Sequence, residues 1–331
     1  MKDKIGVAVI GCGWIAQQHL KGIAADKRLE AVAVVDINEE RAGTVAKEFG
    51  VRKFYPDWKD ALNDKEIAAV IICLPHNLHA EVTIAAAGKG IHVLVEKPMA
   101  ISLKEVDSMI AAADSNGVTL MVGQVLRKWT VYKKAKEMIT AGRIGTPCRV
   151  IRRRLMASRP DKYPDNLPWA RDPAKSGGWL LYGYGAHEID LLLWLFNTHA
   201  VEMYALGAKV NPIWNDFDEI TIDMRLANGV VCTGIFSMNV PVPAWDCSII
   251  GTKGSMHIAD AKIILGTEER IDVNDNAWTT ATMEQMEEFA TSIVKKCEPD
   301  ASGRSVRKTM AALEAARTSL NEGSIVDASA L

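Results

Sequence analysis

Residues 5–16 limit the possible folds more than any other segment of the chain. The apolar run Ile5–Ile10 leads into a Gly-x-Gly-x-x-Ala segment, Gly11-Cys12-Gly13-Trp14-Ile15-Ala16, where a helical pattern begins. In a strand–turn–helix of this kind, Gly11 permits the tight turn, Gly13 lets the backbone approach a pyrophosphate, and Ala16 allows close helix–strand packing. The helix N-terminus, with Trp14 and Ile15 in its first turn, offers phosphates free N–H groups and a favourable dipole. The segment therefore predicts a dinucleotide site in a doubly wound α/β domain.

The first 120 residues continue this alternation of strands and helices. Nearly continuous apolar runs predict strands of a buried parallel sheet at Ile5–Ile10, Ala31–Val35, Ala68–Leu74, His92–Val95 and Val118–Val122. Apolar residues at helical spacing predict helices at Trp14–Ala25, Glu39–Phe49, Asp57–Leu62, Ala80–Lys89 and Ser102–Asn116. Such alternation is typical of right-handed βαβ units.

An acidic residue, Asp36, ends the second expected strand, 23 residues after Gly13. A carboxylate there accepts hydrogen bonds from the ribose hydroxyls and repels a 2′-phosphate, which favours NAD over NADP. Asn38 and Arg41 lie close by in the sequence, so NADP stays an alternative. The competing interpretation is a glycine turn without a nucleotide, in which Asp36 caps a helix.

Composition excludes several classes of protein. A length of 331 residues favours two domains, and 48% hydrophobic residues with a formal charge of −2 exclude a disordered chain and a chain-wide polycation that binds nucleic acid. The six scattered cysteines form no CxxC, so we expect neither a metal site nor a disulfide framework. No apolar run is long enough for a membrane span or a signal peptide, which predicts a soluble, cytoplasmic protein.

The pattern changes after residue 122, and we place a domain boundary there, with residues 1–122 binding the cofactor and 123–331 the substrate. Alternating segments predict a large, mainly antiparallel sheet in an α+β domain, at Cys148–Met156, Val201–Val210, Glu219–Leu226, Val230–Met238, Asp246–Ile250 and Ser255–Ala259. Expected helices are Val131–Ala141, Ala186–Phe196, Met283–Lys296 and Ser305–Glu322. Because these helices cover one face of the sheet, we expect a homodimer or homotetramer that buries the other.

Six motifs occur in order along almost the whole chain. They are Val9-Ile-Gly-Cys-Gly13, Cys73-Leu-Pro-His-Asn-Leu-His79, Glu96-Lys97-Pro98, Gly177-Gly178, Gly185-Ala-His187-Glu-Ile-Asp190-Leu-Leu-Leu-Trp194 and Gly251-Thr-Lys-Gly-Ser255. With these motifs the sequence resembles the glucose–fructose oxidoreductase/inositol dehydrogenase/MocA (Gfo/Idh/MocA) family. The resemblance implies a Rossmann domain, a second α+β domain, and NAD(P)-dependent oxidation or reduction of sugars, cyclitols and related polyols.

The resemblance also implies roles around the expected nicotinamide. Lys97 would bind and polarise the reacting hydroxyl or carbonyl, and the Lys97–Pro98 bond would be cis. Glu96 and Pro75 would contact the nicotinamide riboside, and Asn77, His79, Lys97 and Gln124 would also lie against the cofactor. The competing interpretation of Lys97 is a solvated lysine at a strand end.

His187 is the second catalytic candidate. It follows Gly183 and Gly185 and precedes an apolar helical run, so it lies near the first turn of a helix, where the dipole favours the neutral imidazole that a general base needs. In the resembling family an Asp is common four residues earlier, but Gly183 stands there. Tyr182, Tyr184 or Glu188 remain alternatives for the missing hydrogen bond. The competing interpretation is a structural histidine.

Further candidates are less specific. The resemblance implies substrate contacts for Arg127, Trp129, Tyr182, Tyr184 and His187. A basic segment holds Arg149, Arg152, Arg153, Arg154, Arg159 and Lys162. This segment would bind an anionic sugar, or alternatively face solvent or a subunit interface.

These observations predict an enzyme that transfers hydride between nicotinamide and a secondary hydroxyl or carbonyl of a sugar, cyclitol or cyclic diol. Its partners would be a sugar-like small molecule, neutral or anionic, and copies of itself, with no nucleic acid and no membrane. The alternatives are an NAD-recycling glycosidase that oxidises transiently and eliminates, and a non-catalytic NAD-binding regulatory protein.

Overall fold

The computed structural model describes residues 4–157, 168–267, 269–273 and 277–331. Backbone contacts divide the chain into two compact units. The first unit is Met1–Lys128 with Asn276–Arg307, and the second is Trp129–Asp275 with Lys308–Leu331. The first unit thus contains a C-terminal segment that a single boundary near residue 122 does not include. Helix α10 (Gly303–Glu322) begins in the first unit and ends in the second.

The first unit is built on a six-stranded parallel sheet. Its strands are β1 (Ile5–Ile10), β2 (Leu29–Val35), β3 (Lys53–Tyr55), β4 (Ala69–Ile72), β5 (His92–Val95) and β6 (Leu120–Val122), in the order β3-β2-β1-β4-β5-β6. The residues of β4 and nearly all of β1 are buried, because helices cover both faces. The strand order reverses between β1 and β4, and ligands of open α/β sheets bind outside the carboxyl ends of the strands at that point.

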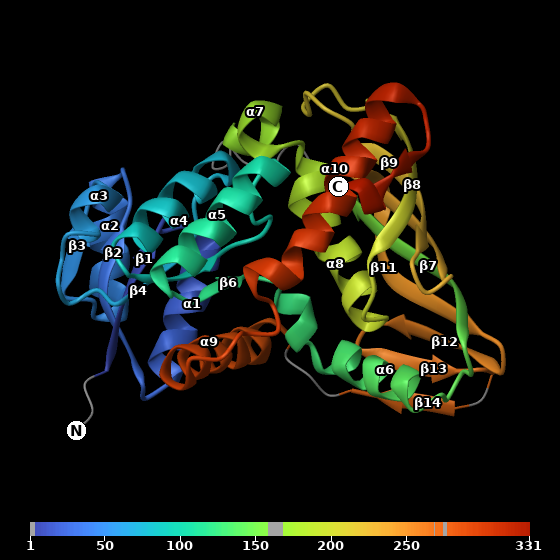
Figure 1. The fold of residues 1–331 in the computed structure, drawn as a ribbon, viewed down its shortest axis with the longest axis horizontal. Helices are drawn as coiled ribbons and strands as arrows, with labels where there is room; N and C mark the ends of the chain where they lie inside the picture. Colours follow the sequence, from blue (N-terminus) through green and yellow to red (C-terminus); the bar gives the residue numbers. More distant parts are fainter. Residues whose placement is uncertain (1–3, 158–167, 268, 274–276) are drawn as a thin grey trace. The chain divides into compact units, whose positions relative to one another are not determined.

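Helices flank this sheet. They are α1 (Trp14–Ala25), α2 (Glu39–Phe49), α3 (Trp58–Ala61), α4 (His79–Gly88), α5 (Leu103–Asn116) and α9 (Ala277–Lys295), with 3-10 turns at His76–Leu78 and Val125–Lys128. Figure 1 shows α4 beside α5, and α1 beside α9. Leu20 and Ile23 of α1 share one buried cluster with Met286 and Phe289 of α9. Helix α9, which follows the large sheet in the sequence, therefore completes the core of the first unit.

The second unit holds a nine-stranded sheet. Its strands are β7 (Pro147–Ala157), β8 (Ala200–Ala208), β9 (Glu219–Leu226), β10 (Val231–Ser237), β11 (Asn239–Gly251), β12 (Gly254–Ala259), β13 (Lys262–Leu265), β14 (Glu269–Asp272) and β15 (Val326–Asp327), in the order β14-β13-β12-β11-β7-β10-β9-β8-β15. Strands β10 and β7 run parallel, and the other neighbours are antiparallel. The sheet is therefore mixed but mainly antiparallel, as predicted.

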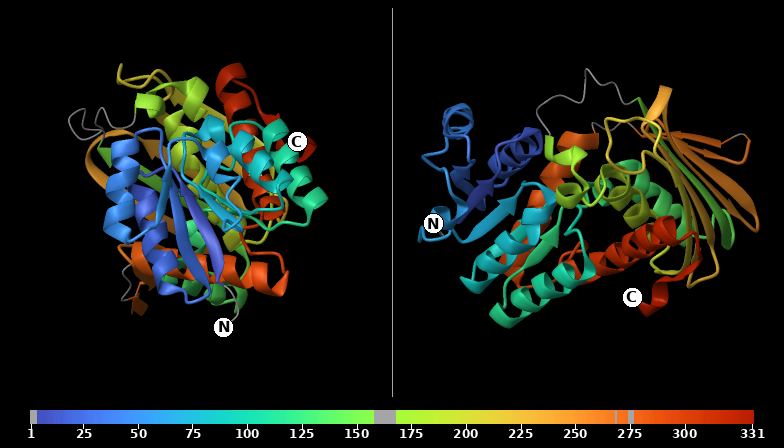
Figure 2. Two further views of the ribbon diagram at one scale, coloured as in Figure 1. Left: turned by 90° about the vertical axis from the view of Figure 1, so that its left-hand side faces the viewer. Right: turned by 90° about the horizontal axis from the view of Figure 1, so that it is seen from above.

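The remaining helices of the second unit are α6 (Thr130–Thr140), α7 (Pro173–Ser176) and α8 (Ala186–Leu195), with a π-helical segment at Trp179–Gly185 and 3-10 turns at Pro168–Arg171 and Ala328–Ala330. The sheet forms one curved layer with helices against one face (Figure 2). Two hydrogen bonds fix that face: Arg152 of β7 donates to Glu188 of α8, and the Ala205 N–H of β8 donates to Ser319 of α10.

Strand β11 begins seven residues earlier than the sequence predicts, at Asn239 rather than Asp246. Pro241 and Pro243 hid this half of the strand, since proline cannot donate to a ladder. Both prolines are exposed, and the register between β11 and β7 shifts between Asn239 and Ala244, so the prolines lie in an irregular part of the ladder where a missing N–H is tolerated. Among the described residues, no helix is both long and apolar enough to cross a membrane.

Candidate functional site

The two glycines of the turn after β1 differ in what their surroundings require. Gly11 has φ +95°, and a Cβ there would lie 2.3 Å from the Cys73 carbonyl oxygen, so the fold itself requires glycine. Gly13 has ordinary backbone angles and is the N-cap of α1, and a Cβ there would meet no atom within 4 Å. Open space beside Gly13, at a helix N-terminus, is compatible with the close approach of a pyrophosphate.

Asp36 links this turn to the end of β2. Its carboxylate accepts hydrogen bonds from the backbone N–H groups of Cys12 (3.0 Å) and Asn38 (2.9 Å). Asn38 is in turn the N-cap of α2, where its side chain accepts from the Arg41 N–H. Arg41 Nε lies 3.7 Å from Asp36. Asp36 is therefore held rigidly at the carboxyl edge of the sheet.

Two further predicted cofactor residues lie in the first turn of α1. Trp14 is 59% exposed and packs edge-on against Trp278, and the next residue, Ile15, is half-buried.

The loop after β4 holds three of the predicted cofactor residues. Pro75 precedes the 3-10 turn His76–Leu78. The amide oxygen of Asn77 is buried and accepts no hydrogen bond from any residue that the structure describes, which fits a donor on a bound ligand. The His79 ring is fully buried, with Nδ1 2.8 Å from the Pro98 carbonyl and Nε2 2.9 Å from the Leu74 carbonyl. Burial lowers the pKa of His79, although both carbonyls oppose this. His79 thus ties the loops after β4 and β5 together.

The Glu96-Lys97-Pro98 segment leaves the carboxyl end of β5. The Lys97–Pro98 bond is cis, as the resemblance implied. Glu96 is buried; one carboxylate oxygen lies 2.7 Å from His19 Nε2, and the other accepts the Lys97 N–H at 3.1 Å. Burial by itself raises the pKa of Glu96, but the hydrogen bond and charge of His19, with the charge of Lys97, lower it overall. The carboxylate therefore stays ionised beneath the half-buried Lys97.

His19 is a residue that sequence reasoning missed. It lies on α1, 77 positions before its partner Glu96, and only its place one turn after Ala16 on the inner face of α1 could have suggested it. Gly123 lies against the same carboxylate, where a Cβ would approach it to 2.9 Å.

Three candidate residues follow β6, and they belong to different units of the chain. Gln124 and Arg127 are both buried in the first unit. The Arg127 guanidinium donates to the Asp300 carbonyl oxygen (2.7 Å) and to the Ser305 hydroxyl (3.0 Å), so it fastens the segment between α9 and α10. Trp129 begins the second unit, where it stacks on Tyr132 and packs edge-on against Trp245. These hydrogen bonds give Arg127 a structural task, and the substrate contacts of Arg127 and Trp129 stay predictions.

His187 is the second residue of α8 and 8% exposed, in the first turn as predicted. The π-helical segment Trp179–Gly185 leads directly into it, and π-helical turns are frequent at functional sites. A Cβ on Gly183 would lie 2.9 Å from the Trp179 ring. A side chain here, including the Asp that is common in the resembling family, would require the Trp179 ring to shift.

Aromatic side chains surround this turn. Tyr182 is buried, while Tyr184 is half-buried and meets Trp179 edge-on. Trp179 also packs against Trp169. Glu188 uses one oxygen to accept from Arg152 and, at 3.4 Å, from Trp245. Glu188 is one of the three alternatives for a hydrogen bond to His187. Its carboxylate instead faces the sheet and accepts from Arg152 of β7 and Trp245 of β11.

The basic segment is divided by the alternation of β7. Arg152 and Arg154 face the helices, whereas Arg153 lies on the other face and pairs with Asp246 at 2.6 Å. Arg149 is exposed. Arg159 and Lys162 fall outside the described residues. The pair of Arg152 and Glu188 is almost completely buried and is a second feature that the sequence did not predict.

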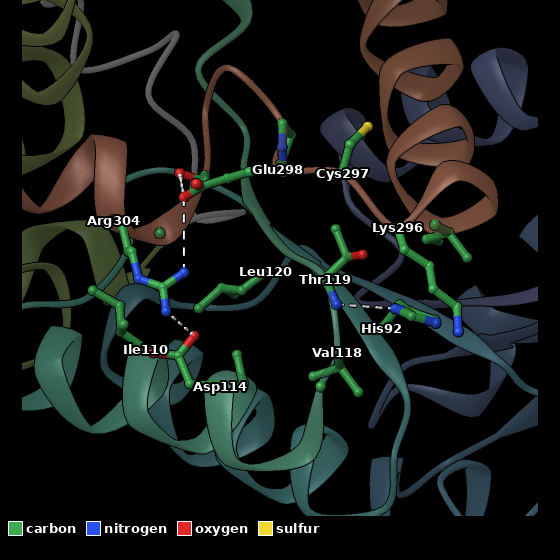
Figure 3. Close-up of a pocket in the computed structure, with 16 residues that line it drawn as sticks. His92, Ile110, Asp114, Val118, Thr119, Leu120, Lys296, Cys297, Glu298 and Arg304 are labelled. Carbon is green, nitrogen blue, oxygen red and sulfur yellow. Dashed lines mark hydrogen bonds and ion pairs between the residues drawn. The ribbon is translucent and has the colours of Figure 1, made fainter.

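A pocket of about 440 Å³ lies in the first unit, at the amino ends of β5 and β6 (Figure 3). His92, Lys296 and Arg304 line it together with Asp114 and Glu298. Arg304 pairs with Asp114 at 2.6 Å, and His92 Nδ1 accepts the Thr119 N–H. Because the glycine turn and Lys97 follow the carboxyl ends of their strands, this pocket is separate from the predicted cofactor site.

Comparison with known proteins identifies relatives along most of the chain. Family models described as "Oxidoreductase family, NAD-binding Rossmann fold" and "GFO/IDH/MocA C-terminal domain" match residues 5–124 and 132–257. The uncharacterized oxidoreductase YrbE of Bacillus subtilis is 31% identical over 77% of this chain and 74% of its own. Myo-inositol 2-dehydrogenase of Thermotoga maritima is 26% identical, with 96% of each chain covered.

Among solved structures, the WlbA dehydrogenase of Bordetella pertussis in complex with NADH and UDP-GlcNAcA has a TM-score of 0.89 and 25% identity, over 99% of this chain and 98% of that one. The matched models, the relatives and the two sheets agree. The chain is a member of the GFO/IDH/MocA oxidoreductase family, and its N-terminal part is that family's NAD-binding Rossmann domain.

Proposed function

We propose that this oxidoreductase transfers hydride between nicotinamide and a secondary hydroxyl or carbonyl of a sugar, cyclitol or related cyclic diol. The observation that carries the proposal is the Glu96-Lys97-Pro98 segment at the carboxyl end of β5. There the buried Glu96 is held by His19 and by the Lys97 backbone. Lys97 follows the carboxyl end of β5, the edge where ligands of such sheets bind. The dehydrogenase names of its relatives support the same reaction class.

The residues present fit a dinucleotide. Gly13 and the N-terminus of α1 would hold the pyrophosphate, and Asp36 the ribose hydroxyls. Pro75, Asn77, Glu96 and Gln124 would hold the nicotinamide half, with His79 positioning their loops. The bound nicotinamide supplies the hydride acceptor or donor. We propose NAD over NADP because Asp36 repels a 2′-phosphate, with Arg41, 3.7 Å from that carboxylate, as the residue that would admit NADP.

Lys97 and His187 would act on the substrate oxygen. The Lys97 ammonium binds this oxygen and stabilises the negative charge that grows on it. His187 lies in the first turn of α8, where the helix dipole favours a neutral imidazole, and would exchange the hydroxyl proton. Tyr182, Tyr184 and Trp129 would provide polar and stacking contacts to the sugar ring.

The test is the Lys97→Ala variant, assayed with NAD and a panel of polyols, cyclitols and sugars. We expect a fall in kcat of about 10²–10³-fold, with NAD affinity within about twofold of wild type. Lys104→Ala is the matched control, since Lys104 is an exposed lysine of the same part of the chain. Unchanged turnover in Lys97→Ala would overturn the assignment.

A second candidate function is favoured by Gly183. This glycine packs against Trp179 and stands where an Asp is common in the family. An NAD-recycling glycosidase would cleave glycosides without net NADH formation. Tight NAD binding with neither turnover nor cleavage across the panel would instead identify a non-catalytic NAD-binding protein. Monitoring NADH absorbance and released sugar in the same reaction separates the three.

We also propose that the chain forms a homo-oligomer through the sheet face opposite the helices. Ile250 and Ile264 are 40% and 37% exposed there, whereas their neighbours Ile249 and Ile263 are fully buried on the helix side. Light scattering of the wild type and of Ile264→Lys tests this, with a monomer expected for the variant. A wild-type monomer would refute it.

A further inference from the structure

Two arginines and one glutamate lie together on the helix-facing side of the nine-stranded sheet. Arg152 is fully buried; its Nε donates to Glu188 at 2.5 Å and its Nη2 to the Tyr132 hydroxyl at 3.1 Å. Arg154, two residues along β7, has 17% of its side chain exposed. Its Nε is 3.9 Å from the other Glu188 oxygen, which is beyond hydrogen-bond length.

Aromatic rings hold the Arg154 guanidinium in place. Its central carbon lies 3.8 Å from the ring centre of Trp245, its cross-strand neighbour on β11, and 5.4 Å from that of Tyr184. Stacking of this kind fixes the plane of the fork while leaving its edge free for hydrogen bonds. The fork is therefore preorganised beside the turn that leads into His187.

The charges of this cluster do not balance. Glu188 supplies one negative charge against the two positive charges of Arg152 and Arg154. Burial raises the pKa of the Tyr132 hydroxyl, and burial raises that of the Cys247 thiol to about 11, so both stay neutral. Asp246 faces the opposite side, where it binds Arg153.

Arg154 Nε makes no hydrogen bond to any residue of the described ranges. A largely buried guanidinium without a hydrogen-bonded anion is costly, and a bound carboxylate removes that cost.

We propose that Arg154 binds a carboxylate of the substrate, so that the enzyme acts on a sugar or cyclitol acid rather than a neutral polyol. The inference rests on the proposed function, since it places the substrate beside His187. A carboxylate suits the site better than a phosphate monoester because its single negative charge matches the one excess positive charge of the cluster. The guanidinium fork can hold it bidentately.

The experiment compares wild type and Arg154→Gln with matched pairs of ligands in the presence of NADH. D-glucuronate and D-galacturonate are paired with D-glucose and D-galactose, and D-glucose 6-phosphate is the phosphate arm. Titration calorimetry measures binding, and NADH formation with NAD measures turnover. We expect at least one uronate to bind wild type ten times more tightly than its neutral partner and the phosphate, and Arg154→Gln to abolish that preference.

Arg153→Gln is the matched control, because Arg153 lies on the same strand and faces the other way; the uronate preference should survive in it. Arg154→Lys keeps the charge but loses the fork, so it should retain only part of the preference. Arg154→Gln should melt at or above the wild-type temperature, whereas loss of a structural ion pair would lower its Tm.

The proposal is overturned if no uronate is preferred, if the phosphate binds best, or if Arg154→Gln keeps the preference. Turnover of neutral sugars alone would refute the carboxylate site and leave the dehydrogenase assignment intact. Carboxylate binding without any redox turnover would support the carboxylate site and refute the dehydrogenase assignment.

Discussion

Replacing Glu188 by leucine removes the only carboxylate within 4 Å of Arg152 and Arg154 in the described part of the chain. Both members of the Arg152–Glu188 pair are at most 1% exposed, so water cannot replace the lost charge. Breaking such a pair costs about 3–5 kcal/mol. For a unit of this size that loss lowers Tm by roughly 6–20 °C.

The reverse change, Arg152→Met, should cost less, about 2–3 kcal/mol. Glu188 would then keep the Trp245 N–H at 3.4 Å and Arg154 at 3.9 Å. In the double variant Arg152→Met/Glu188→Leu both charges are gone, and we expect it to be more stable than Glu188→Leu alone.

Urea unfolding followed by tryptophan fluorescence is the assay, because six of the nine tryptophans belong to the second unit. A coupling energy of about 2 kcal/mol or more between the two changes is expected from a double-mutant cycle. Costs that simply add in the double variant, or a loss under about 1 kcal/mol in Glu188→Leu, would refute the reasoning.

Three further changes test the first unit and the turn before His187. Gly11→Ala should destabilise by at least about 1–3 kcal/mol because of its positive φ, whereas Gly13→Ala should cost under about 1 kcal/mol in unfolding yet weaken NAD binding at least tenfold by calorimetry; equal stability losses would contradict this. The pKa of Glu96 is lower in the folded chain than its ordinary value of 4.5, so its stabilisation is complete above that value and is lost as the pH falls through the lower folded one. Melting curves between about pH 6 and pH 3 should therefore fall more steeply for wild type than for Glu96→Gln, and parallel curves would refute the ion pair. Gly183→Ala should lose about 1–3 kcal/mol by overpacking against Trp179, and a Tm equal to wild type would show that the turn can relax.

Local patterns predicted most of the fold. The strands of the Rossmann sheet and its main helices follow from periodicity, since buried parallel strands and amphipathic helices leave strong signals. Strand β3 was missed because it has only three residues at the sheet edge, and the proline-containing half of β11 lacks the strand pattern. The return of α9 to the first unit is a long-range contact that no local pattern encodes.

The candidate site also contains residues that local patterns could predict and residues that they could not. Gly11, Gly13, Asp36 and Lys97 lie next to strand ends, so their places followed from topology. His19 and Arg152 are polar residues whose partners are 77 and 36 positions away, and only packing of the complete chain brings such pairs together. Arg127 is buried, and its guanidinium donates to the Asp300 carbonyl and the Ser305 hydroxyl, two partners that no local pattern could predict; its contact with substrate stays a prediction.

The contribution of α9 to the first unit also affects how the protein is made. When residues 1–128 have left the ribosome, Leu20 and Ile23 still lack Met286 and Phe289, which complete their apolar cluster. At about 5–20 residues per second, these partners are synthesised on the order of 10–30 s later. During that interval the nucleotide-binding unit exposes an unfinished apolar surface to chaperones. The apolar cluster of the first unit can be completed only after most of the second unit, residues 129–275, has been translated.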